Sequence, residues 1–281
     1  MRFTLLALIT FVTPLWAQVD TDALRSNTGL SYIVTGRGSR SIVLIHGSNL
    51  DHRMWDAEAR SLSTTARVLQ YDLRGHGASA DPTETYSAWE DLRDLLDEVG
   101  MERAVVMGLS AGAGIALDFA LTYPERVDAL VLASPTISGF TPAERPAFFD
   151  DLLSAIRAKD YEQANEVLLS SPVFSVPDAS RALVREMVVG NIRLWTLDPT
   201  RQQPLSPPAL QRLADLASPV LVLVGENDIA DIHAQAKLIE HGVAGSKLVM
   251  IPGGGHLLNL TSPQQFTDEV RKFLARLDPP S

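Results

Sequence analysis

Short apolar runs alternating with helical patterns constrain the fold of this 281-residue chain more than any other feature. The runs are rich in Val, Ile and Leu and occupy residues 31–34, 42–45, 68–71, 105–108, 130–133, 220–224 and 248–251. Between them, apolar residues recur at helical spacing, as at Leu92, Leu95 and Leu96 before Gly100, and again from Phe266 onward. Unbroken apolar strands separated by helices are typical of a mostly parallel sheet with helices on both faces. The sequence therefore predicts an α/β protein.

The composition supports a folded domain and excludes several kinds of chemistry. Apolar residues make up 46% of the chain and charged residues 21%, which suits a sizeable core and argues against disorder. The formal net charge of -10 disfavours binding to nucleic acid or to anionic lipid. The chain has no cysteine, so disulfides, thiol catalysis and thiolate metal sites are excluded.

The first residues have the pattern of a targeting segment. Arg2 is the only charge before Asp20, residues 3–16 are mostly apolar, and a small residue, Ala17, follows. This pattern predicts a secretory signal peptide over residues 1–17, and hence an exported protein, periplasmic or secreted, formed by residues 18–281 as a single domain. The run is shorter than the roughly 20 residues of a membrane-spanning helix, so no stable membrane span is expected. The alternative is an N-terminal helix packed on the fold.

Residues 139–208 interrupt the alternation of strands and helices. They carry helical patterns around residues 148–156 and 182–195, and they end in the proline-rich stretch 204–208. This segment is predicted to be a helical lid inserted over the carboxyl edge of the sheet, where open α/β sheets bind ligands. Phe148, Phe149 and Trp195 are expected in the core of the lid, although each could instead line a substrate pocket.

Gly108-Leu109-Ser110-Ala111-Gly112 is the strongest indication of chemistry. It follows a strand run and precedes a helix start rich in small residues, which is the setting of a tight turn that presents a nucleophilic serine. A serine in a structural turn is the alternative. The pattern predicts that Ser110 is a nucleophile, and such a serine needs an adjacent base.

His256 is the best candidate for that base. It follows the last strand run in a glycine-rich loop, Pro252-Gly253-Gly254-Gly255-His256, that could bring the imidazole to Ser110. Of the other histidines, His46 and His76 are expected to shape loops. His52, His233 and His241 are expected at the surface.

The acid that orients the histidine is expected after residues 220–224. Asp228 is the preferred candidate, with Glu226 and Asp231 as alternatives. The order Ser110, Asp228, His256 along the chain matches that of one known class of catalytic triad. The aspartate would hold the tautomer of the imidazole and stabilise its protonated form.

Acyl transfer also needs hydrogen-bond donors for the charge that develops on the carbonyl oxygen. The backbone N–H of Ala111 is expected to provide one donor. The loop His46-Gly47-Ser48-Asn49 is expected to provide the other, from Ser48 or alternatively from Asn49.

Taken together, these motifs resemble the α/β-hydrolase superfamily over residues 30–277. The stretch from Tyr71 to Ser79 resembles its D-x-R-G-x-G-x-S turn, and residues 254–256 resemble its histidine loop. Within the superfamily, the chain looks most like the small esterase and enol-lactonase branch, which includes cofactor-free haloperoxidases. In that turn Arg74 is expected to brace loops, although it could instead meet a substrate carboxylate.

The resemblance implies an α/β-hydrolase fold and a serine-dependent hydrolase that cleaves a small or medium carboxylic ester or lactone through an acyl-enzyme, without cofactor or metal. A haloperoxidase or perhydrolase, or a ligand-binding protein on the same fold, is the alternative. Epoxide hydrolases and haloalkane dehalogenases carry an aspartate where this chain has Ser110, so their reactions are not expected here. Neither the substrate nor the oligomeric state follows from the sequence.

Overall fold

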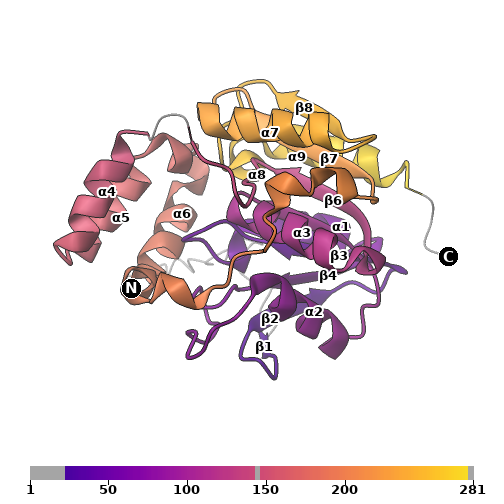
Figure 1. Cartoon of the computed structure of the whole chain (residues 1–281), viewed down its shortest axis with the longest axis horizontal. Helices are drawn as coiled ribbons and strands as arrows, with labels where there is room; N and C mark the ends of the chain where they lie inside the picture. Colours follow the sequence, from indigo (N-terminus) through magenta and orange to yellow (C-terminus); the bar gives the residue numbers. More distant parts are fainter. Residues whose placement is uncertain (1–22, 143–145, 278–281) are drawn as a thin grey trace, which may run out of the picture.

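A computed structural model describes residues 23–142 and 146–277 of the chain. Its central feature is an eight-stranded sheet in the order β1-β2-β4-β3-β5-β6-β7-β8 (Figure 1). The strands are β1 (Leu24–Arg25), β2 (Ser31–Thr35), β3 (Arg40–Ile45), β4 (Ala66–Tyr71), β5 (Ala104–Leu109), β6 (Val127–Ala133), β7 (Val220–Gly225) and β8 (Lys247–Ile251). β1 and β2 are antiparallel to their neighbours, and all pairings from β4 to β8 are parallel.

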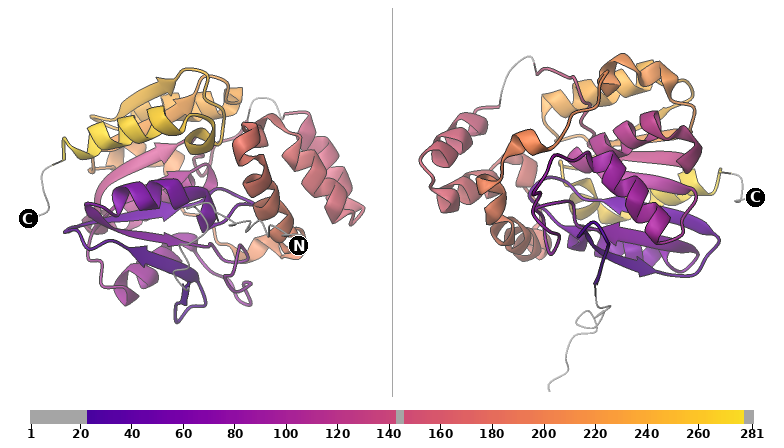
Figure 2. Two further views of the ribbon diagram at one scale, coloured as in Figure 1. Left: turned by 180° about the vertical axis from the view of Figure 1, so that it is seen from behind. Right: turned by 60° about the horizontal axis from the view of Figure 1, so that its bottom comes forward.

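Helices cover both faces of this sheet. They are α1 (Asp56–Leu62), α2 (Ala88–Glu98), α3 (Ala111–Thr122), α7 (Ala230–Gly242), α8 (Leu258–Thr261) and α9 (Pro263–Leu274). One apolar cluster joins the sheet to α2, α3 and α7, and the other joins it to α1, α8 and α9. Figure 2 shows α1 and α9 together on the face that Figure 1 turns away from the viewer. The predicted α/β architecture is confirmed.

The strand side chains explain why the apolar runs are unbroken. Successive strand residues point to opposite faces of a sheet. Val43 and Ile45 accordingly belong to the first cluster, whereas Ile42 and Leu44 belong to the second. Because both faces are covered, most positions along the central strands are apolar, with the buried Gln70 of β4 as an exception, and the usual alternation with polar residues is lost.

The segment predicted as a helical insertion contains α4 (Phe148–Arg157), α5 (Tyr161–Leu169) and α6 (Asp178–Gly190). Figure 1 shows these three helices grouped to one side of the sheet. The helical pattern of residues 182–195 divides into the end of α6 and a 3₁₀ turn, Ile192–Thr196. The sequence did not predict α5, whose buried side includes the small Ala164 and the polar Asn165 in place of an apolar stripe.

The predicted signal peptide, residues 1–17, lies outside the described residues. No helix in the described ranges has the length and apolar character needed to cross a bilayer.

Candidate active site

Ser110 occupies a strained turn between β5 and α3. Its φ of 55° and ψ of −116° lie where non-glycine residues rarely occur. Backbone hydrogen bonds hold it there: its N–H donates to Ala133 O at 2.9 Å, and its carbonyl accepts from Ala113 N at 3.0 Å and from Thr136 Oγ1 at 3.1 Å. Strain of this kind persists only where the surroundings impose it, and it is common at functional sites.

The two glycines that flank Ser110 allow the turn to close. A Cβ on Gly108 would lie 2.2 Å from the carbonyl oxygen of Gly112, and a Cβ on Gly112 would lie 2.3 Å from the carbonyl oxygen of Ile45. Backbone atoms cannot yield as a side chain can. The tight packing of α3 against β3 and β5 therefore requires glycine at both positions.

Asp228 and His256 are brought together at the carboxyl ends of β7 and β8. His256 Nδ1 lies 2.9 Å from Asp228 Oδ1 and 3.1 Å from Oδ2, and both side chains are buried. Because carboxylate oxygens accept hydrogen bonds, the proton of this pair is assigned to Nδ1, which leaves Nε2 as the acceptor nitrogen. Ile229 N donates to Asp228 Oδ1 at 2.8 Å and helps to fix the carboxylate.

The alternative acids occupy other positions. Glu226 is exposed and accepts a hydrogen bond from Gly253 N at 2.9 Å, so it supports the loop before the histidine. Asp231 lies in the first turn of α7. Among the described residues, Asp228 is the carboxylate that contacts His256.

Contacts that the sequence did not reveal fix the loop of His256. Ser134, at the end of β6, has a φ of 44° and donates through Oγ to the carbonyl of His256 at 2.8 Å. Gly225 packs on the same loop, since a Cβ there would lie 2.3 Å from Gly254 O. The histidine is thus tied by its backbone to the sheet and by its imidazole to Asp228.

The loop after β3 lies beside Ser110, as expected for a loop that supplies an oxyanion donor. A Cβ on Gly47 would lie 3.6 Å from the Cβ of Ser110. Ser48 follows and is exposed, whereas Asn49 is buried and has a φ of 60°. Ala111 begins α3, and the first N–H groups of a helix have no partner within it.

Residues 46–52 are defined here as the oxyanion loop, after the role expected for them, and side-chain hydrogen bonds hold them in place. The His46 imidazole contacts Gly47 O through Nδ1 at 2.8 Å and accepts from Leu73 N through Nε2 at 2.9 Å. Burial lowers the pKa of His46, which keeps the ring neutral and suits this pair of bonds. The expectation that His46 shapes its loop is confirmed by these contacts.

His52 was expected at the surface, and that prediction is wrong. Its Nδ1 lies 2.7 Å from Asp72 Oδ1, and its backbone N–H donates to the same oxygen at 2.9 Å. Burial is the largest single influence and opposes the charge on both side chains, but their hydrogen bond and the attraction of neighbouring charges together outweigh it, lowering the pKa of Asp72 to about 2 and raising that of His52. Asp72 also accepts from Ala78 N at 2.8 Å and so connects the oxyanion loop to the turn after β4.

Ser110 and His256 line one cavity of about 310 Å³, together with residues 47–50. Its other walls are apolar and come from Leu109, Leu257 and the helical insertion. Apart from the two candidate catalytic side chains, the polar groups at this cavity belong to the oxyanion loop. The cavity therefore suits an uncharged, apolar group beside a reacting carbonyl.

The aromatic residues of the insertion were expected in its core, but Phe148, Phe149 and Trp195 all line this cavity. Phe148 and Trp195 also pack against a core cluster. Trp195 Nε1 donates to Asn165 Oδ1 at 2.7 Å, which fixes the indole against α5. The helical spacing of these residues does not reveal that they face a cavity.

Arg74 braces the structure, as predicted. Its guanidinium forms two 2.7 Å bonds with the carboxylate of Asp91 and a further bond to Thr28 O. The arginine is thus committed to α2 and to the chain before β2.

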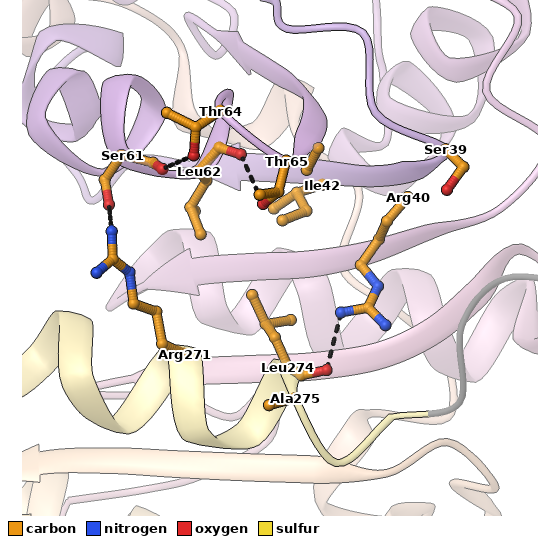
Figure 3. Close-up of a pocket in the computed structure, with 11 residues that line it drawn as sticks. Ser39, Arg40, Ile42, Ser61, Leu62, Thr64, Thr65, Arg271, Leu274 and Ala275 are labelled. Atoms are coloured by element: carbon orange, nitrogen blue, oxygen red, sulfur yellow. Dashed lines mark hydrogen bonds between the residues drawn. The ribbon is translucent and has the colours of Figure 1, made fainter.

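A larger cavity, of about 490 Å³, lies between the end of α1, the start of β3 and α9 (Figure 3). Its two arginines have partners: Arg40 donates to Leu274 O, and Arg271 donates to Ser61 Oγ. None of Ser110, Asp228 and His256 lines this cavity.

One cluster in the described part of the chain has residue types that could bind a metal ion: it consists of Asp51, His52 and Asp72. Asp72 is bonded to His52, and Asp51 forms a two-point contact with Arg53. These atoms are engaged in ion pairs, so the cluster is explained as support for the oxyanion loop.

Comparison with known proteins identifies the family of this fold. Residues 42–269 match the model of the alpha/beta hydrolase family. The chain is 30% identical over 251 residues to a pimeloyl-acyl-carrier protein methyl ester esterase of Nitrosomonas europaea, covering 83% of this chain and 94% of the relative.

Solved structures share the fold. The enol-lactonase of Burkholderia xenovorans superposes with a TM-score of 0.72 at 24% identity, over 88% of this chain and 96% of that protein. A bromoperoxidase of Bacillus anthracis gives 0.74 at 24% identity, over 88% and 95%. At this identity the structural likeness establishes the fold alone. With the family match over most of its length, the chain belongs to the α/β-hydrolase family and is a hydrolase built on that fold.

Proposed function

We propose that the protein is a serine hydrolase that cleaves a small or medium carboxylic ester or lactone through an acyl-enzyme. The observation that carries this proposal is one cavity lined by both Ser110 and His256, with His256 bonded to the buried Asp228. A serine in a strained, partly exposed turn, a base whose Nε2 is left as an acceptor and a carboxylate behind that base are the parts of a nucleophilic triad.

In the proposed reaction, Ser110 Oγ attacks the carbonyl carbon of the substrate while His256 Nε2 takes the hydroxyl proton. The negative charge passes to the carbonyl oxygen, which the N–H groups of Ala111 and of Ser48 stabilise. His256 then gives its proton to the departing alkoxide. Water, activated by the same nitrogen, attacks the acyl-enzyme and releases the acid and free Ser110. Asp228 stabilises the imidazolium in both halves, and no cofactor takes part.

The walls of the cavity support an uncharged acyl group. Phe148, Phe149 and Trp195 give an aromatic surface, and the volume of about 310 Å³ lies at the lower end of the range for small-molecule pockets. A carboxylate on the acyl chain would lose its hydration there without meeting a cation.

Export of the protein is part of the proposal, on the strength of the sequence of residues 1–17. Expression in a bacterial host followed by N-terminal sequencing of the exported protein tests this. A new terminus at Gln18 is expected, and an intact Met1 on exported protein would contradict it.

A perhydrolase or haloperoxidase would form the same acyl-enzyme, but hydrogen peroxide would attack it in place of water. A ligand-binding protein would share the cavity and leave Ser110 inert. The bonded pair Asp228–His256 favours catalysis over binding alone, since a binder gains nothing from an oriented base.

Replacement of Ser110 tests the proposal. Wild-type protein is expected to react with a fluorophosphonate probe at Ser110 and to turn over p-nitrophenyl butyrate. In Ser110→Ala both the labelling and the turnover should vanish, while the thermal melting temperature stays close to that of the wild type. Turnover in Ser110→Ala with a pre-steady-state burst would overturn the assignment, and an unlabelled wild type would favour the binding protein.

A further inference from the structure

Asn191 connects the helical insertion to the oxyanion loop. It is the first residue after α6, and its side chain is 1% exposed. Its Nδ2 donates to Leu50 O at 3.0 Å and to Asn49 O at 3.3 Å, and its Oδ1 accepts from Gly77 N at 2.7 Å. One buried amide therefore joins three segments of the chain.

The oxyanion loop needs such an anchor. Asn49 has a φ of 60°, a left-handed conformation that asparagine tolerates better than most residues, at some cost. Within the loop, the bond from Leu50 N to Gly47 O is long, at 3.3 Å. Contacts from outside the loop therefore add to its restraint. The carbonyls that Asn191 binds lie one and two residues after Ser48, whose N–H group is proposed to face the substrate.

The known anchors of the loop fall into two sets. His46 is held by Leu73, and Asp72 holds His52; both contacts come from the turn after β4. Asn191 is the contact to the loop from the insertion, and it reaches the same turn through Gly77. The oxyanion loop is therefore held between the sheet and the insertion.

We propose that Asn191 is a positioning residue for the oxyanion hole. By holding the carbonyls of Asn49 and Leu50, its amide keeps the N–H group of Ser48 directed at the oxygen of the reacting carbonyl. The donor geometry then depends on the insertion being docked. This inference rests on the proposed acyl transfer at Ser110.

An amide is the group that this place requires. It donates to two carbonyls on one side and accepts an N–H on the other. An aspartate of nearly the same shape keeps the acceptor for Gly77 but loses both donors, and its charge faces the carbonyl oxygens of residues 49 and 50. Asn191→Asp therefore separates the contact with the oxyanion loop from the contact with the turn.

Arg193 offers a matched control two residues along the chain. Its guanidinium bonds to Gly77 O, Ser79 O and Asp81, so it ties the insertion to the same turn. The described contacts of Arg193 do not include the oxyanion loop. Arg193→Ala should loosen the insertion and leave the loop in place.

The experiment compares Asn191→Asp, Arg193→Ala and wild type. It measures kcat and KM for p-nitrophenyl butyrate, with the concentration of active sites determined by titration with a fluorophosphonate. It also measures the inhibition constant of an alkyl trifluoromethyl ketone and the melting temperature. The ketone forms an oxyanion on Ser110, so it reports on the oxyanion hole. Loss of one oxyanion donor costs about 100-fold or more in kcat, so a misdirected donor in Asn191→Asp should cost about tenfold, with KM changed less than threefold.

The ketone should bind Asn191→Asp more weakly by the same factor, whereas Arg193→Ala should keep kcat and ketone affinity within threefold despite a lower melting temperature. Wild-type kcat and ketone affinity in Asn191→Asp, or equal losses in Arg193→Ala, would overturn the inference. If Asn191→Asp does not fold, Asn191→Ser takes its place, with a smaller but parallel loss of kcat and ketone affinity expected. Absence of labelling and turnover in the wild type would instead refute the proposed function.

Discussion

Two turns meet at the candidate active site, and they are held in different ways. The turn at Ser110 is fixed by backbone: glycines allow close approach, and main-chain hydrogen bonds from neighbouring strands set its strained conformation. The oxyanion loop is fixed by side chains, among them His46, Asp72 and Asn191, which belong to or contact other segments. The loop of His256 combines both means, with Ser134 on its backbone and Asp228 on its ring.

The turn at Ser110 and the oxyanion loop should respond differently to substitution. A turn held by backbone packing tolerates no added volume, so changes there act on folding. A loop held by distant side chains can lose one contact and remain folded with altered geometry, so changes there act first on activity. The turn of Ser110 is therefore easy to recognise in the sequence, whereas the distant side chains that hold the oxyanion loop are not.

After Ser110→Ala, Asp228→Asn should give the largest loss of activity among variants that keep the fold. The carboxylate accepts the Nδ1–H of His256, whereas an amide replaces one of its two oxygens with an NH₂ donor and so favours the wrong tautomer of the imidazole. The corresponding substitution in a serine protease costs about 10⁴-fold in kcat. Activity on p-nitrophenyl butyrate checks this. Glu226→Gln and Asp231→Asn are the matched controls and should stay within threefold of wild type. A comparable loss in either control would move the acid to that residue.

Gly112→Ala tests the turn that backbone packing holds. The new Cβ would lie 2.3 Å from Ile45 O and 2.5 Å from His46 O, so α3 must move away from β3. Overpacking of this kind costs about 1–3 kcal/mol and more where only backbone can yield, and chemical denaturation measures it.

Gly190→Ala is the control for that measurement. This glycine closes α6, has no heavy atom within 4 Å of an added Cβ, and should be neutral or slightly stabilised by the change. Equal stability of the two alanine variants would mean that the turn at Ser110 is not held by close backbone approach.

The sequence predicted the parts whose causes are local. The glycines around Ser110, the apolar run before it and the small residues after it all lie within one strand–turn–helix unit, so their pattern can be read directly. The same holds for the strands β2 to β8, because each covered face demands apolar residues. β1 has two residues, too few to show a period.

The remaining parts depend on residues that are distant in the sequence. Asn191 meets Leu50 across 141 positions, and no local pattern marks it. His52 was misplaced at the surface because its partner Asp72 follows 20 residues later. The lid aromatics were assigned to the core because helical spacing reports which residues share a face and not what that face meets.

Asp72→Asn gives the smallest expected effect and tests whether side chains hold the oxyanion loop. The charge of Asp72 supports His52, so the variant should be destabilised by about 1–1.5 kcal/mol, the difference between a hydrogen bond to a charged group and one to a neutral group. The cost should depend on pH in two ways. The pKa of Asp72 is lowered to about 2, so its contribution is present above its unfolded value near 3.8 and is lost as the pH falls through 2.

The pKa of His52 is raised, so its contribution is fully present below its unfolded value of 6.5 and is lost as the pH rises through the folded value. The stability difference between wild type and Asp72→Asn should therefore peak near pH 5 to 6 and shrink by pH 9, as measured by urea denaturation across that range. In His52→Gln the alkaline decline should disappear, because the titrating partner is gone. A difference that stays constant from pH 5 to 9 would show that the pair contributes shape and not charge, and would place the oxyanion loop closer to the backbone-held turn at Ser110.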